Sequence, residues 1–153
     1  MNSKNNCTLC PRECNVDRKQ GAMGVCGVAG TGIVGARAAL HMWEEPCISG
    51  DKGSGTVFFS GCPLRCVYCQ NYDIARATRG TVIEESRLAE IFLELQEKGA
   101  ANINLVTPTH YTPEIVRALQ EAKRNGLWLP IVYNCSGYEK VETLQTLEGL
   151  VDI

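Results

Sequence analysis

Three cysteines follow one another at a spacing that suits the binding of an inorganic centre. They lie in the stretch SGCPLRCVYCQNY, residues 60–72, and are Cys62, Cys66 and Cys69. Gly61 and Pro63 favour a tightly curled loop in which three thiolates can converge. A four-iron cluster normally takes four thiolates, so three would leave one iron open to a ligand that does not come from the protein.

Zinc binding and simple burial are the alternatives for these thiols. A structural zinc site needs a fourth Cys or His, and apart from the three thiols the stretch from Gly61 to Tyr111 offers only His110. The spacing therefore favours an iron–sulfur cluster.

A second group of cysteines lies near the N-terminus and consists of Cys7, Cys10, Cys14 and Cys26. Four thiolates can close a tetrahedral zinc site or hold a second cluster, and ligand type alone does not separate these two. Residues 1–50 are rich in Cys and Gly, so we expect a Cys-rich, irregular N-terminal module that bound metal would stabilise. The alternative is that some of these thiols are merely buried.

Composition limits the classes of function that come into question. The chain has 153 residues, of which 44% are hydrophobic and 21% charged, with a net charge of -2. This balance is typical of a globular domain and gives no field that would attract nucleic acid. Nine cysteines, an odd number, indicate metal or redox chemistry rather than disulfides. No apolar run is long enough to span a membrane, so we expect a cytoplasmic protein with neither membrane nor nucleic-acid partners.

Residues 30–35, GTGIVG, match the pattern GxGxxG. A dinucleotide fingerprint must lie between a buried strand and a helix, and the preceding residues, 21–27, do not predict a strand. We therefore reject this function and expect an extended piece or short strand over Ile33–Met42. His41, Trp43 and Cys47 are expected to pack.

Beyond residue 50 the pattern becomes regular. Short apolar runs predict buried strands at 56–59, 102–106, 129–133 and 150–153. Apolar residues at helical spacing predict helices between them, with Thr112 as an N-cap and Val141, Leu144 and Leu147 as the buried stripe of the last helix. Repeated strand–helix units predict an α/β fold with a parallel sheet over residues 51–153.

The loops that follow the predicted strands carry the polar residues. Besides the cysteine loop these are Thr107–His110 and Asn134–Tyr138. In barrel-type sheets the active site lies at the carboxyl ends of the strands, so we expect the three loops to share one rim. About four strands cannot close a barrel, and the chain ends on an apolar run, so we expect an incomplete barrel and a truncated chain.

Blocks along nearly the whole chain resemble the radical S-adenosylmethionine (SAM) superfamily, and more closely the pyruvate formate-lyase activating enzyme-like proteins. These blocks are CTLCPREC at 7–14, EEPCISG at 44–50, GSGTVFFSGCPLRCVYCQNY at 53–72, NINLVTPTHY at 102–111 and PIVYNCSGYE at 130–139. The resemblance implies a parallel (β/α) partial TIM barrel. It also implies that the three loop cysteines bind a 4Fe-4S cluster whose fourth iron is chelated by SAM.

The resemblance further implies a reaction and partners. Reductive cleavage of SAM would give a 5′-deoxyadenosyl radical that abstracts a hydrogen atom from a substrate, which would be a glycyl-radical enzyme if the chain is an activase. An electron donor such as flavodoxin or ferredoxin is required, and Arg65, Arg76 and Arg79 are candidates for its docking patch. The alternative is a non-catalytic iron–sulfur or zinc module, an inactive fragment of a split or truncated gene.

The resemblance and the positions of the loops also suggest residues that bind SAM. These are Tyr68, Asn71, Thr107, Thr109, His110, Asn134 and Ser136. Many relatives hold the SAM amino group with a Gly-Gly-Glu-type segment after the second strand, where this chain has Thr107-Pro108-Thr109-His110. His110 suits a pocket hydrogen bond or proton transfer, because its pKa is near neutrality; a structural role is the alternative.

Overall fold

Short runs of β-branched and aromatic residues form a five-stranded sheet in the order β3-β1-β2-β4-β5. The computed structural model describes residues 6–30 and 32–153. Its strands are β1 (Ile33–His41), β2 (Ser54–Phe59), β3 (Thr81–Ile83), β4 (Ile103–Val106) and β5 (Ile131–Asn134). Its helices are α1 (Pro46–Ser49), α2 (Tyr72–Ala75), α3 (Glu85–Glu97), α4 (Thr112–Arg124) and α5 (Val141–Gln145), with 3-10 turns η2 (Arg18–Gln20) and η3 (Thr109–Tyr111).

The sheet is mixed, which corrects the prediction of a wholly parallel one. Strands β2, β4 and β5 are parallel neighbours, as the strand–helix pattern predicts. Strand β1 runs antiparallel to both β2 and β3. The connection from β1 to β2 carries only the single-turn helix α1, and a parallel pair would need a longer crossover. The predicted extended piece over Ile33–Met42 is thus a full strand, and residues 33–35 open no dinucleotide-binding helix. Beyond this strand the prediction that Trp43 and Cys47 pack is wrong, since both are exposed, whereas the ring of His41 lies 6.3 Å from that of Phe58.

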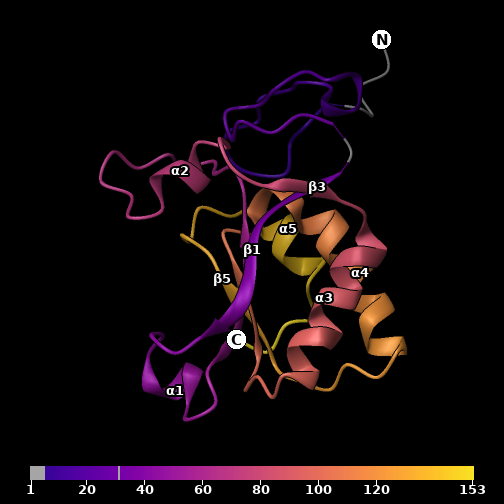
Figure 1. Cartoon of the computed structure of the whole chain (residues 1–153). Coiled ribbons are helices and arrows are strands. Elements are labelled where there is room, and N and C mark those ends of the chain that lie inside the picture. The colour runs from indigo at the N-terminus through magenta and orange to yellow at the C-terminus, as the bar shows by residue number, and fades with distance from the viewer. Residues whose placement is uncertain (1–5, 31) are drawn as a thin grey trace.

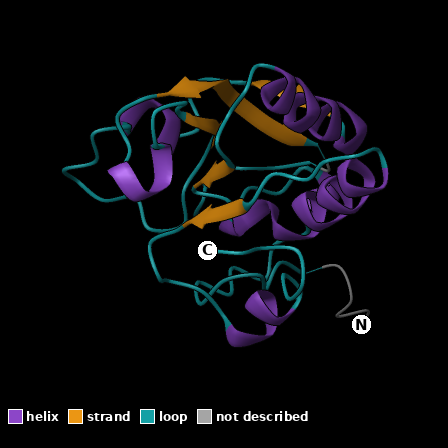
Figure 2. Ribbon diagram, turned by 90° about the horizontal axis from the view of Figure 1, so that it is seen from below, coloured by secondary structure: helices purple, strands orange, loops and turns teal. Residues whose placement is uncertain are grey.

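Helices α3 and α4 pack side by side against one face of the sheet and enclose the hydrophobic core (Figure 2). The predicted apolar stripe of α3 is confirmed, since Leu88, Phe92 and Leu95 are buried. The facing strand residues Val57 and Phe59 are equally inaccessible. Full burial of one such side chain contributes roughly 1.5–3 kcal/mol, so this layer is the main stabilising element beneath the strand-exit loops.

Two predicted helix features are wrong. Thr112 is not an N-cap but the first residue of α4, because η3 runs directly into the helix and the Thr112 hydroxyl donates to the Thr109 carbonyl at 2.9 Å. The predicted stripe of the last helix is wrong for two of its three residues, because Val141 is 68% exposed and Leu144 43% exposed. Leu147 is buried as predicted, but it lies beyond the end of α5. This single-turn helix instead buries Thr143, whose hydroxyl donates to the Leu9 carbonyl at 2.7 Å.

The chain end lies against the edge of β5 without forming the predicted strand over 150–153. The Ile131 carbonyl accepts hydrogen bonds from the amides of Asp152 and Ile153, and the Tyr133 amide donates to the Ile153 carbonyl. A fourth bond joins the Ile131 amide to the Asp152 carboxylate at 2.8 Å. These contacts pair the backbone of β5 without a regular ladder.

The Cys-rich N-terminal segment, residues 6–30, lies over the end of the sheet where the parallel strands finish (Figure 1). Cys26 and Val28 belong to the same hydrophobic core as the sheet and the long helices. The division of the chain at residue 50 remains a prediction, although β1 is hydrogen-bonded into the sheet. Among the helices of the described residues, none is long and apolar enough to cross a membrane.

Candidate functional site

The cysteine loop begins at the carboxyl end of β2, and its base is held by backbone contacts. Gly61 has φ 89°, and a Cβ there would lie 2.7 Å from the Cys26 carbonyl and 2.7 Å from the Val28 side chain. Only glycine fits this position without displacing its neighbours. The Gly61 amide donates to the Ile74 carbonyl at 2.8 Å, and the Cys62 amide donates to the Cys26 carbonyl at 3.1 Å. The two ends of the loop are therefore tied together.

The body of this loop projects away from the sheet together with α2 (Figure 1). Cys62, Cys66 and Cys69 are free and half-buried. Arg65 turns the chain between the first two of them with φ 53°. The intervening Val67 and Tyr68 are 85% and 87% exposed. The thiols thus lie on an accessible loop with a fixed base.

This donor set fits an iron–sulfur centre with one open iron. Three free thiols on one loop supply three ligands of the type that such clusters take. Within residues 6–30 and 32–153, no group of three or more Cys, His, Asp or Glu side chains is already arranged to hold a metal ion. Binding would therefore require the three thiols of residues 62–69 to converge, while the Gly61 and Cys62 contacts hold the base of the loop.

The loop after β4 is buried and carries its own network of hydrogen bonds. The Thr107 amide donates to the Asn134 carbonyl at 3.0 Å, and the Thr109 hydroxyl donates to Glu139 Oε1 at 2.6 Å. His110 Nε2 donates to the Ser60 carbonyl at 2.8 Å. Burial lowers the pKa of His110 to about 4. The ring is thus neutral near pH 7 and joins this loop to the root of the cysteine loop.

The loop after β5 completes the rim. Asn134 and Ser136 are exposed, whereas Glu139 is half-buried and one of its carboxylate oxygens, Oε2, is buried without a hydrogen-bond partner. Burial raises the pKa of Glu139 and also that of Cys135. Glu139 was not among the predicted site residues, although it is the acid of the block PIVYNCSGYE and follows a predicted strand.

Hydrogen bonds bring some of the predicted site residues together. Thr107 is hydrogen-bonded to Asn134, and Thr109 to Glu139. His110 is hydrogen-bonded to the Ser60 carbonyl, immediately before the cysteine loop. Tyr68 and Asn71 lie farther along that loop, where Asn71 precedes α2. The assignment of all these residues, and of Ser136, to a SAM pocket remains a prediction.

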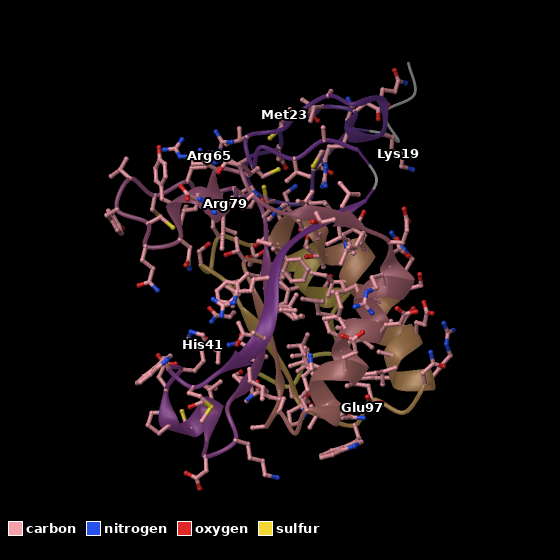
Figure 3. The ribbon with its side chains drawn as sticks, in the orientation of Figure 1. Lys19, Met23, His41, Arg65, Arg79 and Glu97 are labelled. Carbon is pink, nitrogen blue, oxygen red and sulfur yellow. The ribbon has the colours of Figure 1, made fainter. Side chains whose placement is uncertain are left out.

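The three arginines of the predicted docking patch differ in their surroundings. Arg65 and Arg79 lie at the root of the projecting loop (Figure 3). Arg79 Nε donates to the Asp73 carboxylate at 3.1 Å, and the Arg76 guanidinium lies 4.9 Å from the centre of the Tyr72 ring. Arg65 packs against Gly27, and its Nε is buried without a partner. An ion pair thus offsets the charge of one of the three.

All four N-terminal cysteines are free and lie in the segment that covers this rim. Cys10 and Cys26 are buried, and Cys7 and Cys14 are half-buried. Burial raises the pKa of Cys10 and Cys26, and the charges of neighbouring N-terminal thiols add to the increase. Two arginines of the segment reach the rim loops: Arg12 donates to the Pro63 carbonyl at 2.9 Å and Arg18 to the His110 carbonyl at 2.7 Å. No pattern in the sequence singled out these arginines.

The fold and the cysteine loop agree with the comparison with known families. The model of the radical SAM superfamily matches residues 56–152, which is more than half of the chain. The chain therefore belongs to the radical SAM superfamily, as the resemblance predicted. Membership implies a 4Fe-4S cluster and SAM as cofactors.

A curated relative carries the likeness through the N-terminal segment as well. The uncharacterized protein MJ0674 of Methanocaldococcus jannaschii is 29% identical over 157 residues, covering 97% of this chain. The aligned region is 44% of that protein, so the chain spans less than half the length of its relative. No solved structure matches the chain.

Proposed function

We propose that this chain supplies the cluster- and SAM-binding part of a radical SAM enzyme. The observation that carries the proposal is the accessible three-thiol loop, Cys62 to Cys69, at the carboxyl end of β2, with its base tied at Gly61 and Cys62. When bound, the cluster and SAM supply a 5′-deoxyadenosyl radical that removes a hydrogen atom from the substrate. The protein's part is to bind, orient and shield these groups.

The rim residues divide these tasks. Cys62, Cys66 and Cys69 would hold three irons and leave the fourth for the amino and carboxylate groups of SAM. Tyr68 and Asn71 from the same loop, and Thr107, Asn134 and Ser136 from the other two, are proposed to line the cofactor pocket. Thr109 would act through Glu139, whose unpartnered oxygen suits a cationic group. His110, neutral near pH 7, would keep the loops in register.

We further propose that the chain is part of a glycyl-radical-enzyme activase. It would receive electrons from flavodoxin or ferredoxin in a reducing cytoplasm. The resemblance to pyruvate formate-lyase activating enzyme-like proteins supports the substrate class. The exposed Val67 and Tyr68 beside the cluster ligands suit contact with a partner protein, and nine free cysteines suit a reducing compartment. An arginine docking patch is retained with Arg65 and Arg76, since Asp73 offsets Arg79.

A second candidate is a non-catalytic iron–sulfur or zinc module. It is favoured by the coverage of only 44% of the length of the relative, because the residues that close a SAM pocket could lie outside the shared part. The two candidates differ in whether SAM reaches the cluster and is cleaved.

The test compares the wild-type protein with Cys66→Ala and with the control Cys47→Ala, which changes an exposed cysteine of α1. After anaerobic reconstitution and reduction, the electron paramagnetic resonance signal should change on addition of SAM, and 5′-deoxyadenosine should accumulate. Cys47→Ala should behave as wild type, and Cys66→Ala should lose both effects. A wild-type cluster that ignores SAM and releases no 5′-deoxyadenosine would favour the non-catalytic module.

A further inference from the structure

The N-terminal segment, residues 6–30, spans the rim but has little internal structure to hold it there. Its one regular element is the three-residue turn η2. Its buried apolar residues within the described part are Cys10, Cys26 and Val28. Ordering an irregular segment costs conformational entropy at each residue, and this small apolar content does little to offset the loss. Hydrogen bonds from Arg12 and Arg18 to the rim loops anchor the segment, and metal bound by its cysteines would add to its stability.

A first tight loop gathers three of the four N-terminal cysteines. The Cys7 amide donates to the Val16 carbonyl at 2.9 Å, and the Asn15 amide returns a bond to the Cys7 carbonyl at 3.1 Å. Between them the Glu13 amide donates to the Cys10 carbonyl at 3.0 Å. Glu13 and Asn15 have φ values of 43° and 54°, so the backbone turns sharply on both sides of Cys14.

A second turn places Cys26 beside this loop. The Gly27 amide donates to the Gly24 carbonyl at 3.0 Å, and the Val25 amide donates to Cys14 Sγ at 3.4 Å. A Cβ on Gly24 would lie 3.5 Å from Cys14 Sγ and 3.7 Å from Cys26 Sγ. The two sulfurs are therefore no farther apart than the sum of these distances. An N–H group aimed at a sulfur also stabilises its thiolate form.

We propose that Cys7, Cys10, Cys14 and Cys26 bind one zinc ion through four thiolates. Zinc takes four sulfur ligands in a tetrahedron, and each thiol releases its proton on binding. The four sulfurs are not grouped at ligand distance, but Cys14 and Cys26 flank the same point near Gly24. Cys7, Cys14 and Cys26 are also close enough to act electrostatically on Cys10. Rotation of the cysteine side chains would close the site, and the guanidinium of Arg18, which acts electrostatically on Cys26, would offset part of its negative charge.

Such a site would also fix the base of the cysteine loop. The Cys26 carbonyl accepts the Cys62 amide at 3.1 Å, and Arg12 donates to the Pro63 carbonyl at 2.9 Å. The metal would thereby hold the backbone against which the first cluster ligand is placed. The proposal does not depend on whether SAM is cleaved.

The first test maps the thiols without any variant. The 153-residue chain is purified without added iron and its zinc is measured. Its cysteines are then alkylated before and after removal of zinc with a chelator. We expect about one zinc per chain. Cys7, Cys10, Cys14 and Cys26 should be protected until the chelator is added, whereas the exposed Cys47 and Cys135 should react at once. Four N-terminal thiols that react freely in protein incubated with excess zinc would overturn the proposal.

The second test replaces the ligands and reads a spectrum. Substitution with Co²⁺ should give the visible bands of a tetrahedral thiolate site in the wild type and in Cys47→Ser. The double variant Cys10→Ser/Cys26→Ser should lose these bands and most of its zinc. The triple variant of Cys62, Cys66 and Cys69 to serine should keep both. Loss of the bands and the zinc in the triple variant would contradict a site at the N-terminal thiols. Iron with acid-labile sulfide bound there would contradict a single-ion site.

Discussion

The loops that follow β2 and β4 leave the sheet side by side but differ in almost every physical respect. After β2 the chain exposes Val67 and Tyr68 by 85% and 87%. After β4 the chain buries Thr109, His110 and Tyr111 to 2%, 3% and 0% exposure. One loop presents free thiols to solvent and the other turns its polar side chains inward.

The difference shows how a rim can combine an adaptable ligand set with a rigid support. Buried polar groups usually have partners, and three groups of the β4 loop find them in Ser60, Glu139 and Asn134. His110 Nδ1 and the Tyr111 hydroxyl are buried without one among the described residues. The bond from His110 to Ser60 ends two residues before Cys62. The β4 loop therefore fixes the point from which the cluster ligands extend, while residues 62–69 keep the freedom to close around a cluster.

The largest expected contrast is in amide hydrogen exchange of the reduced, cluster-free protein. The amides of Thr107 and Tyr111 are bonded to carbonyls in a buried loop, so their exchange should require opening close to global unfolding. Those of Val67 and Tyr68 should exchange almost without protection, a difference of roughly a thousand-fold or more for a domain of ordinary stability. Mass spectrometry of peptides from the two loops measures it. Similar rates in both would show that the β4 loop is not a rigid support.

Removing the cation that holds the β4 loop should have the next largest effect. Arg18 is buried, donates to the His110 carbonyl at 2.7 Å and lies 5.5 Å from the centre of the Tyr111 ring. Arg18→Met leaves that buried carbonyl without its donor, so we expect a loss of roughly 2–4 kcal/mol in the free energy of unfolding. The matched control, Lys19→Met, alters an exposed residue of the same turn and should stay within about 0.5 kcal/mol. Urea denaturation compares the two, and equal losses would remove the special role of Arg18.

His110 should give the protein a pH dependence of known sign. Its pKa falls from 6.5 to about 4 on folding because of burial, so the unfolded chain binds more protons than the folded one between these values. The stability it contributes is complete above pH 6.5 and is lost as pH falls toward 4, by at most roughly 3 kcal/mol. Burial raises the pKa of Glu114 and Glu139, which acts in the opposite direction.

The comparison of wild type with His110→Gln cancels the contribution of these acids. Glutamine keeps a donor for the Ser60 carbonyl but does not titrate. Urea denaturation at several values between pH 4 and 7 should show the wild type losing its advantage over the variant as pH falls. A constant difference across this range would mean that His110 is protonated alike in the folded and unfolded chains.

The sequence predicted the parts of this architecture that depend on local patterns. Apolar runs located β2, β4 and β5, and helical spacing located α3, because a buried strand or helix face has a fixed period. The pairing of β1 with β2 and β3 was not predicted, since no period in β1 records which strands lie beside it. Once β1 is known to pair with β2, their short connection requires the antiparallel orientation. The exposure of Val141 and Leu144 was not predicted for a similar reason, because the buried residue of α5 is Thr143, which contacts the distant Leu9 carbonyl.

The candidate site also has residues that a local pattern predicts and residues that it does not. The spacing of Cys62, Cys66 and Cys69 is local and was visible at once. The contacts of Arg18 with His110 and of Thr109 with Glu139 join residues 92 and 30 positions apart. Such pairs depend on which loops meet at the rim, so a single sequence gives no signal for them.

The smallest effect on stability should come from the most exposed aromatic side chain of the rim. Tyr68 is 87% exposed, so Tyr68→Ala removes little buried surface and should change the free energy of unfolding by less than about 0.5 kcal/mol. If the cysteine loop after β2 binds SAM, the same change should weaken SAM binding to the reconstituted protein several-fold, because an aromatic face is lost beside the cofactor. Urea denaturation and titration of the SAM-dependent resonance signal separate these two quantities. A large loss of stability would place Tyr68 in the core, and unchanged SAM affinity would limit the binding role of the loop to its cysteines and backbone.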